Sequence, residues 1–166
     1  MVNCIDAIKK CAVLRWKKIQ YISRSLDLID IGFGDMHKKV GRNGKMRNFA
    51  TYAIHIQCPF RVINQNEILT GSEDLYISSI DESYIDLNDD SISLFDDIIG
   101  RNINILKKER VTDIKINEFG DLEIKCQNIR ILVFVAGTTD CEAWRFFEVG
   151  KDDSHLVVSG KGFEFQ

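Results

Sequence analysis

The sequence lacks the features that mark secreted, membrane-spanning and disulfide-bonded chains. Its five cysteines are an odd number and include no Cys-x-x-Cys pair, and charged residues interrupt the apolar ones near the N-terminus. We therefore expect no signal sequence and reduced thiols. The longest clean apolar run, Ile131 to Ala136, is too short to cross a bilayer. These absences predict a cytoplasmic protein that does not associate with a membrane.

Basic residues are absent between Val62 and Gly100, where the chain carries ten acidic residues. The net charge of −3 hides this segregation: residues 1–50 hold eleven Lys and Arg against four Asp and Glu (+7), and residues 51–166 hold eleven against twenty-one (−10). An acidic segment of this kind is solvated, repels a phosphate backbone and attracts a basic partner. We assign the surface for such a partner to Asp81, Glu82, Asp86, Asp89, Asp90, Asp96 and Asp97.

The remaining composition is typical of a single α+β domain over residues 1–166. The apolar fraction is 45%, the charged fraction is 28%, and the abundance of Ile, Val and Phe favours strands. Apolar residues spaced by three and four predict an amphipathic helix over residues 3–22, with a basic opposite side. Asp90 or Ser91 is expected to cap a short central helix that ends at Gly100.

Alternating apolar residues predict antiparallel strands for most of the rest of the chain. A short buried strand is expected over residues 26–33, followed by a polar loop over 35–47. Residues 51–64 and 67–70 are expected to form a hairpin around the turn signal Asn64-Gln65-Asn66. From Ile103 onward the pattern predicts an antiparallel meander that includes residues 129–136, as a central strand covered on both sides, and ends with residues 144–149 and 155–158.

The stretch from Thr51 to Asn64 gives the clearest strand pattern, because its even positions are all apolar or aromatic from residue 52 to residue 62. The odd positions then place His55, Gln57 and Arg61 side by side on the other face. Three such side chains suit an anion, which the Arg61 guanidinium could bind in a bidentate manner. We therefore treat this row as the candidate ligand site.

The same row has a structural alternative. Arg61 lies across the predicted hairpin from Glu73 and Asp74, and an ion pair there would stabilise the turn without any ligand. If the row is instead a working site, Asp74 or His155 is the candidate proton partner for His55. The residue types alone do not decide between the two interpretations.

Patterns that suggest metal or nucleophile chemistry are weak. His55 and Cys58 have a zinc-like spacing, but on a strand this spacing sends them to opposite faces, and Cys58 then belongs to the apolar face as an inert thiol. Asp86, Asn88 and Asp90 match the first oxygen positions of a calcium loop, but the glycine required at the sixth position is missing. We predict no catalytic residue, no metal site and no cofactor.

Five segments resemble a family of small uncharacterised bacterial proteins, in which the position of Phe60 is often a tryptophan. The segments are His55-Ile-Gln-Cys-Pro-Phe-Arg61, Gly71-Ser-Glu-Asp-Leu-Tyr76, Gly120-Asp-Leu122, Trp144-Arg-Phe-Phe147 and His155-Leu-Val-Val158. The resemblance extends from about Leu26 onward and implies a single bacterial domain. Some small bacterial proteins of this general kind are suspected immunity proteins of toxin systems. The resemblance implies no catalytic residue.

Two classes of function follow from these observations. The first is a cytosolic protein of the immunity type that binds a basic protein, such as a toxin, through the acidic segment. The second is a small-molecule-binding or enzymatic domain with an anion site at His55, Gln57 and Arg61; the absence of a nucleophile, metal motif or cofactor loop disfavours an enzyme. Nucleic-acid binding through the N-terminal helix and residues 38–47 ranks last, because the acidic remainder of the chain opposes it.

Overall fold

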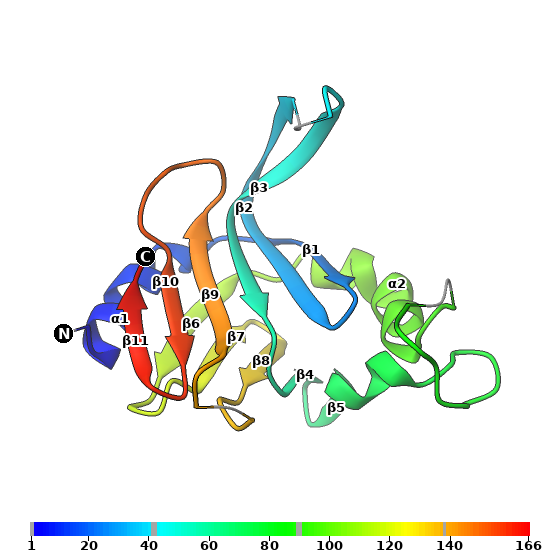
Figure 1. Ribbon diagram of the computed structural model, residues 1–166. Coiled ribbons are helices and arrows are strands. Elements are labelled where there is room, and N and C mark those ends of the chain that lie inside the picture. Colours follow the sequence, from blue (N-terminus) through cyan, green and yellow to red (C-terminus); the bar gives the residue numbers. More distant parts are fainter. Residues whose placement is uncertain (1, 41–42, 89–90, 138) are drawn as a thin grey trace.

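The chain folds into two antiparallel β-sheets that pack face to face (Figure 1). This computed structural model describes residues 2–166 apart from 41–42, 89–90 and 138. The six-stranded sheet has the order β1 (Ile19–Ser25), β2 (Leu28–Val40), β3 (Met46–Ile56), β9 (Glu142–Glu148), β10 (Leu156–Ser159) and β11 (Gly162–Phe165). The five-stranded sheet has the order β5 (Glu67–Gly71), β4 (Phe60–Asn64), β8 (Ile129–Val133), β7 (Leu122–Cys126) and β6 (Val111–Ile116). The α+β class is confirmed, but the strands form two sheets where the sequence predicted one.

The helical elements are α1 (Cys4–Cys11), α2 (Leu94–Leu106) and the 3₁₀ turns η1 (Ala12–Leu14) and η2 (Ser72–Tyr76). The predicted helix over residues 3–22 is therefore too long. Trp16 has a φ of 66°, and its N–H donates to the carbonyl of Val111 at 2.7 Å. Pairing with the start of β6 thus replaces the helix, although the apolar spacing continues to Ile19 by coincidence.

The predicted short strand and polar loop over residues 26–47 are instead most of a long hairpin, β2–β3, which projects beyond the sheet (Figure 1). A register shift between Phe33 and Met36 accompanies Gly34, whose φ is 92°. We call its outer part, Met36–Val40 paired with Met46–Ala50, the basic arm. Its exposed residues mix the cations Lys38, Lys39 and Arg47 with the apolar Met36, Val40 and Met46, so the sequence carries no clean apolar alternation there.

The predicted strand from Thr51 to Asn64 is broken into β3 and β4, which belong to different sheets. The break falls at Pro59, which has no N–H to donate to a β-ladder. The Gln57 N–H donates to the Ala143 carbonyl at 2.8 Å, and the Phe134 N–H donates to the Pro59 carbonyl at 2.8 Å. The link between β3 and β4 is therefore a corner at which the chain passes from one sheet to the other.

Helix α2 begins later and ends later than predicted. Ser93 is its N-cap and forms a capping box with Asp96, while Gly100 lies inside the helix. A Cβ placed on Gly100 would meet no atom within 4 Å, so nothing requires the helix to end there. Ile103 and Ile105, predicted to alternate on a strand, are helical.

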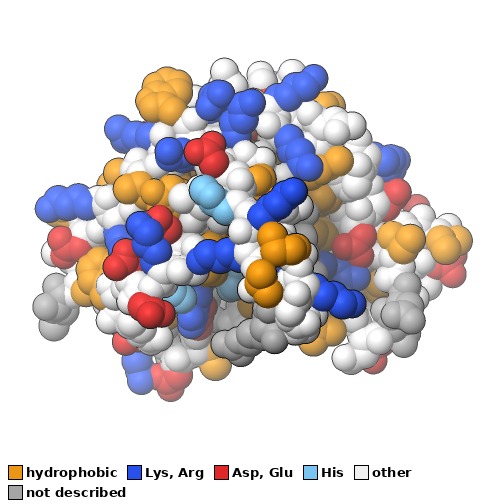
Figure 2. Space-filling view, turned by 90° about the horizontal axis from the view of Figure 1, so that it is seen from above, with side chains coloured by type: hydrophobic (Ala, Val, Ile, Leu, Met, Phe, Trp, Pro, Cys, Tyr) orange, Lys and Arg blue, Asp and Glu red, His pale blue; other side chains and the backbone are white. Residues whose placement is uncertain are grey.

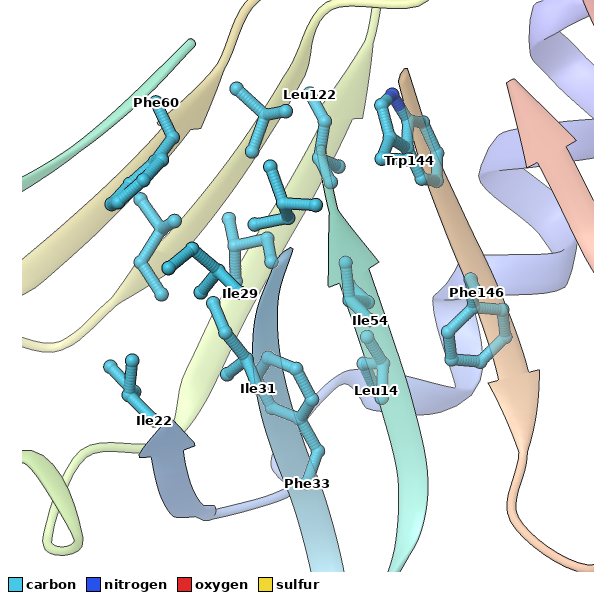
Figure 3. Close-up of a cluster of buried hydrophobic side chains, with 14 of the residues drawn as sticks. Leu14, Ile22, Ile29, Ile31, Phe33, Ile54, Phe60, Leu122, Trp144 and Phe146 are labelled. Carbon is cyan, nitrogen blue, oxygen red and sulfur yellow. The ribbon is translucent and has the colours of Figure 1, made fainter. Parts of the chain in front are cut away.

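The core lies between the two sheets and is built from the inner faces of both (Figure 3). Trp144 of β9 is fully buried and donates its indole N–H to the Gly120 carbonyl at 2.8 Å. Phe95 anchors α2 by packing edge-on against Phe60 of β4, with ring centroids 5.8 Å apart. Burial of each large side chain contributes about 1.5–3 kcal/mol, so this shared core accounts for the face-to-face arrangement.

The predicted β4–β5 hairpin is present, and β6, β7 and β8 form a meander. The later strands do not continue this meander: β9 and β10 lie in the six-stranded sheet, where Phe146 pairs with Ile54. Strand β8 is central, between β4 and β7, but it is not covered on both sides, because Arg130 is exposed on its outer face.

Candidate functional sites

The predicted row of His55, Gln57 and Arg61 is not formed. His55 lies on the outer face of the six-stranded sheet, whereas Arg61 lies on β4 of the five-stranded sheet, between the buried residues Phe60 and Val62. Gln57 is exposed in the link between the two strands. Because the two sheets pack through their inner faces, the imidazole and the guanidinium are on opposite sides of the sandwich. The three residues do not make one anion site.

The Arg61 side chain packs against an aromatic ring. Its guanidinium carbon lies 5.2 Å from the centre of the Phe134 ring, and its Nε is buried without a hydrogen-bond partner. Arg61 forms no ion pair within the described part of the chain, so the expected pair with Glu73 or Asp74 is also wrong. The Asp74 carboxylate instead accepts a hydrogen bond of 2.7 Å from the Thr70 hydroxyl.

A different polar cluster lies on the outer face of the six-stranded sheet. The strand register places Asp30 of β2, His55 of β3 and Arg145 of β9 in one row. The Phe147 ring meets the His55 ring edge-on at 4.8 Å and stacks on the His155 ring at 4.6 Å. We call the six residues Tyr21, Asp30, His55, Glu142, Arg145 and His155 the histidine cluster.

Hydrogen bonds and one longer polar contact connect the members of the histidine cluster. The Tyr21 hydroxyl donates to the Asp30 carboxylate, whose Oδ1 lies 3.7 Å from His55 Nε2. This Oδ1 is buried and makes no hydrogen bond. Arg145 Nε donates to Glu142 Oε1 at 2.6 Å. Arg145 Nη1 lies 3.3 Å from Nδ1 of His155, the residue before β10.

Burial shapes the protonation of this cluster. Burial raises the pKa of Asp30, although His55 and the hydrogen bond from Tyr21 oppose this shift. Burial and the negative charge of Asp30 both raise the pKa of Tyr21. Burial also lowers the pKa of His55, although Asp30 pulls it upward, and burial and the Arg145 charge lower the pKa of His155. Both imidazoles are therefore neutral near pH 7.

This arrangement suits proton transfer and small-ligand binding better than anion capture. Arg145 is paired with Glu142, so its charge is already compensated. A neutral His55 can accept a proton, and Asp30 Oδ1 can accept a hydrogen bond from a ligand donor. The cluster contains no cysteine, and burial raises the pKa of the Cys58 thiol, in the link between β3 and β4, to about 12, which keeps it protonated.

Metal binding finds no support in the described residues. They contain no group of three or more His, Cys, Asp or Glu side chains that could hold a metal ion. The calcium-loop interpretation also involved Asp90, which lies outside the described residues. The exposed Asp86 instead accepts hydrogen bonds from the backbone N–H and the side chain of Asn88, at 2.9 and 2.8 Å.

The predicted acidic surface is divided between a loop and the start of a helix. Asp81, Glu82 and Asp86 are exposed between η2 and α2, and Asp89 and Asp90 lie outside the described residues. Hydrogen bonds from Ser83 and from Asn88 lower the pKa of Asp81 and of Asp86 respectively. Asp81 and Asp86 are therefore charged at neutral pH.

Asp96 and Asp97 are occupied by internal contacts. Asp96 accepts a hydrogen bond of 2.7 Å from Arg24 and closes the capping box with Ser93. Partial burial raises the pKa of Asp96, but these hydrogen bonds outweigh burial and hold it below its usual value. Asp97 forms an ion pair with Arg101, one helical turn further on. These two carboxylates have protein partners already.

Exposed apolar side chains accompany the loop acids, which the charge pattern alone did not reveal. We call residues 77–88 and 91–93 the acidic loop. Ile80 is 91% exposed, Tyr84 78% and Ile92 60%. Single exposed apolar side chains are ordinary, whereas several that gather with charge on one surface are typical of interaction surfaces. A window that combined charge with apolar residues would have found them in the sequence.

The comparisons with known proteins give no relative from which a function can be transferred: no protein-family model, no curated protein and no solved structure matches the chain significantly. Within the described residues, no helix is long and apolar enough to span a membrane. The functional argument therefore depends on the geometry of the chain itself.

Proposed function

We propose that this chain is a cytosolic bacterial protein-binding domain of the immunity type, which engages a basic protein through the acidic loop. The observation that carries the proposal is the interleaving of exposed Ile80 and Tyr84 with the charged Asp81, Glu82 and Asp86. Apolar and aromatic anchors surrounded by charge are the features that give a protein interface both affinity and partner choice.

The backbone of the acidic loop is held in place before any partner binds. The Ser78 N–H donates to the Ser83 carbonyl at 2.8 Å, and the Ile85 N–H donates to the Tyr76 carbonyl at 2.9 Å. At its other end the Leu94 N–H donates to the Ile77 carbonyl at 2.7 Å. A preordered loop loses less conformational entropy on binding, which favours affinity.

The sign of the loop charge selects the class of partner. Residues 62–100 contain ten acids and no base, so the field around this region attracts a cationic protein over long range. A secreted or injected toxin of basic character, such as one that acts on nucleic acid, is a partner of this kind.

Affinity capture from the native host, followed by binding measurements on the purified partner, tests the proposal. The wild-type chain should capture a basic protein whose affinity falls when salt is raised from about 0.15 to 0.5 M. The variant Asp81→Asn/Glu82→Gln/Asp86→Asn should weaken binding mainly through slower association. Tyr84→Ala should weaken it through faster dissociation.

A matched charge control is available elsewhere on the surface. Glu118→Gln/Asp152→Asn/Glu164→Gln removes the same charge from exposed positions outside the acidic loop. This control should bind the partner as the wild type does. Equal binding by the loop variant and the control, or a captured partner that is acidic, would exclude the proposal.

A second candidate function is small-molecule binding at the histidine cluster, favoured by the unpaired, buried Oδ1 of Asp30 beside a neutral His55. A ligand with a planar ring would contact Phe147, and an N–H or O–H donor on it would satisfy Oδ1 once a cluster side chain moves aside, because this oxygen is buried. Thermal-shift screening against a metabolite library should find compounds that stabilise the wild type but not His55→Ala. His37→Ala, which changes an exposed histidine of the arm, is the control. If no compound in the library stabilises the wild type, the histidine cluster has a structural role only.

A further inference from the structure

We infer that the basic arm is a binding element for double-stranded DNA, independent of the acidic loop. The sequence predicted a loop over these residues, but the structure makes it a two-stranded ribbon that leaves the body of the protein (Figure 1). The register from Met36↔Ala50 to Val40↔Met46 gives a ribbon about 17 Å long. The major groove of B-DNA is about 12 Å wide and admits a two-stranded ribbon.

The ribbon carries cations on both faces. Lys39 pairs with Arg47 on the face that also bears His55 further down β3, whereas Lys38 pairs with Asn48 on the opposite face. Lys38, Lys39 and Arg47 are exposed, and in the described part of the chain none of them forms a salt bridge, although Lys39 Nζ donates a hydrogen bond of 3.1 Å to the Gly150 carbonyl. Residues 36–50 contain no acid. A ribbon inserted in the groove would therefore face phosphates on both sides with uncompensated charge.

A second basic surface lies at the foot of the arm. Lys17, Lys18 and Arg110 line a hollow of about 350 Å³, which also includes Gly34 and Asp35 from the bulge where the arm begins. Figure 2, which looks onto this end of the molecule, shows Lys and Arg side chains gathered over its upper and central part, with acidic ones mostly at its lower left and right. These cations are placed to contact the phosphates that flank the groove.

Trp16 adds an aromatic surface next to these cations. Its side chain is 66% exposed, and its backbone has a φ of 66°, an uncommon conformation for a bulky residue. The Arg110 guanidinium fixes this conformation by donating to the Trp16 carbonyl at 2.9 Å. An exposed ring beside three cations can pack on the sugar-phosphate backbone. The sequence analysis identified the basic residues, but it did not reveal that an exposed aromatic residue lies among them.

The choice of DNA follows from groove shape. The major groove of an RNA duplex is too deep and narrow for a ribbon to enter, and a single strand has no groove. The acidic loop extends from another side of the molecule (Figure 1), so it does not face a duplex bound at the arm. The projecting shape of the arm and the charge at its foot together favour the B-form duplex as the partner.

Fluorescence anisotropy with a labelled DNA duplex of about 20 base pairs tests the inference. The full chain should bind at about 50 mM salt, and its affinity should fall steeply towards 200 mM. Lys38→Glu/Lys39→Glu/Arg47→Glu should abolish measurable binding at about 200 mM, and the neutral Lys38→Gln/Lys39→Gln/Arg47→Gln should reduce the salt slope by about 3. Trp16→Ala should weaken binding without changing that slope, because it removes an uncharged contact.

The control variant Lys115→Glu/Lys125→Glu/Arg130→Glu makes the same charge change at exposed positions on the five-stranded sheet, away from the arm. It should retain most of the affinity of the wild type, and circular dichroism should show that all variants fold. Equal losses in the arm variant and the control would overturn the inference, as would absence of binding at low salt. Equal affinity for duplex RNA, single-stranded DNA or heparin would also overturn it, because that result shows a general polyanion surface.

Discussion

The basic arm and the acidic loop both extend from the sandwich, yet they are attached to it in different ways. Beyond Ala50 the strands of the arm pair only with each other, and their side chains are exposed from Met36 to Val40. The acidic loop has little regular structure, but it leads through Ser93 into α2, which packs on the core through Phe95. Charge on the arm is therefore separable from stability, whereas the position of the loop depends on the helix that follows it.

The largest loss of stability is expected when Phe95, which anchors α2 to the core, is removed. Phe95→Ala should reduce the free energy of unfolding by about 3–5 kcal/mol, because it removes a fully buried ring from its contact with Phe60. Urea denaturation measures the loss, and limited proteolysis within the acidic loop should become faster. The arm variant Lys38→Glu/Lys39→Glu/Arg47→Glu should change stability by less than about 0.5 kcal/mol. A comparable loss in the arm variant would show that the arm is coupled to the core.

A smaller effect is expected near the foot of the arm, at Gly32. A Cβ there would lie 2.3 Å from Cε1 of the Tyr21 ring, so Gly32→Ala must displace the ring or the strand and should destabilise the protein by about 1–3 kcal/mol. The displaced Tyr21 would lose its hydrogen bond to Asp30, and ultraviolet titration should show its pKa falling towards the ordinary value. The control Gly100→Ala, in an open helical position, should stabilise by about 0.5–1 kcal/mol. An unchanged Tyr21 titration would contradict the proposed packing.

The smallest effect is the contribution of the histidine cluster to the pH dependence of folding stability. The folded-state pKa values of His55 and His155 are lowered from 6.5, so below that pH the unfolded chain binds more protons and stability falls. Asp30 acts in the opposite direction, because its raised pKa favours proton uptake by the folded state. His55→Gln/His155→Gln should lose less stability than the wild type between about pH 7 and 5, and Asp30→Asn should lose more. Parallel curves for all three proteins would show that the cluster does not titrate on folding.

The sequence predicted the parts of the fold in which one face of a strand is buried and the other is not. The β4–β5 hairpin and the β6–β8 meander show this alternation, and both are present. The arm was missed because both its faces are solvated, and the break at Pro59 was missed because the apolar alternation continues across it from Ile56 to Phe60. In each case the local pattern did not reveal which sheet a segment joins.

The histidine cluster was predicted only in part, for a related reason. His55 was singled out, and His155 was considered as its proton partner, but Asp30 and Arg145 were not connected with it. Each of these two lies between apolar neighbours in a strand, which indicates an outward side chain. Their meeting depends on the pairing of β2, β3 and β9, and such long-range register cannot be read from a single sequence.

The pairing of β3 with β9 also constrains how the chain folds during synthesis. The two partners are about 90 residues apart, so β3 has no neighbour on that side until the C-terminal third has left the ribosome. During this interval the backbone N–H and C=O groups of β3 form an open edge that another nascent chain could join. A chaperone that shields Thr51 to Ile56 during this interval would therefore raise the yield of native protein.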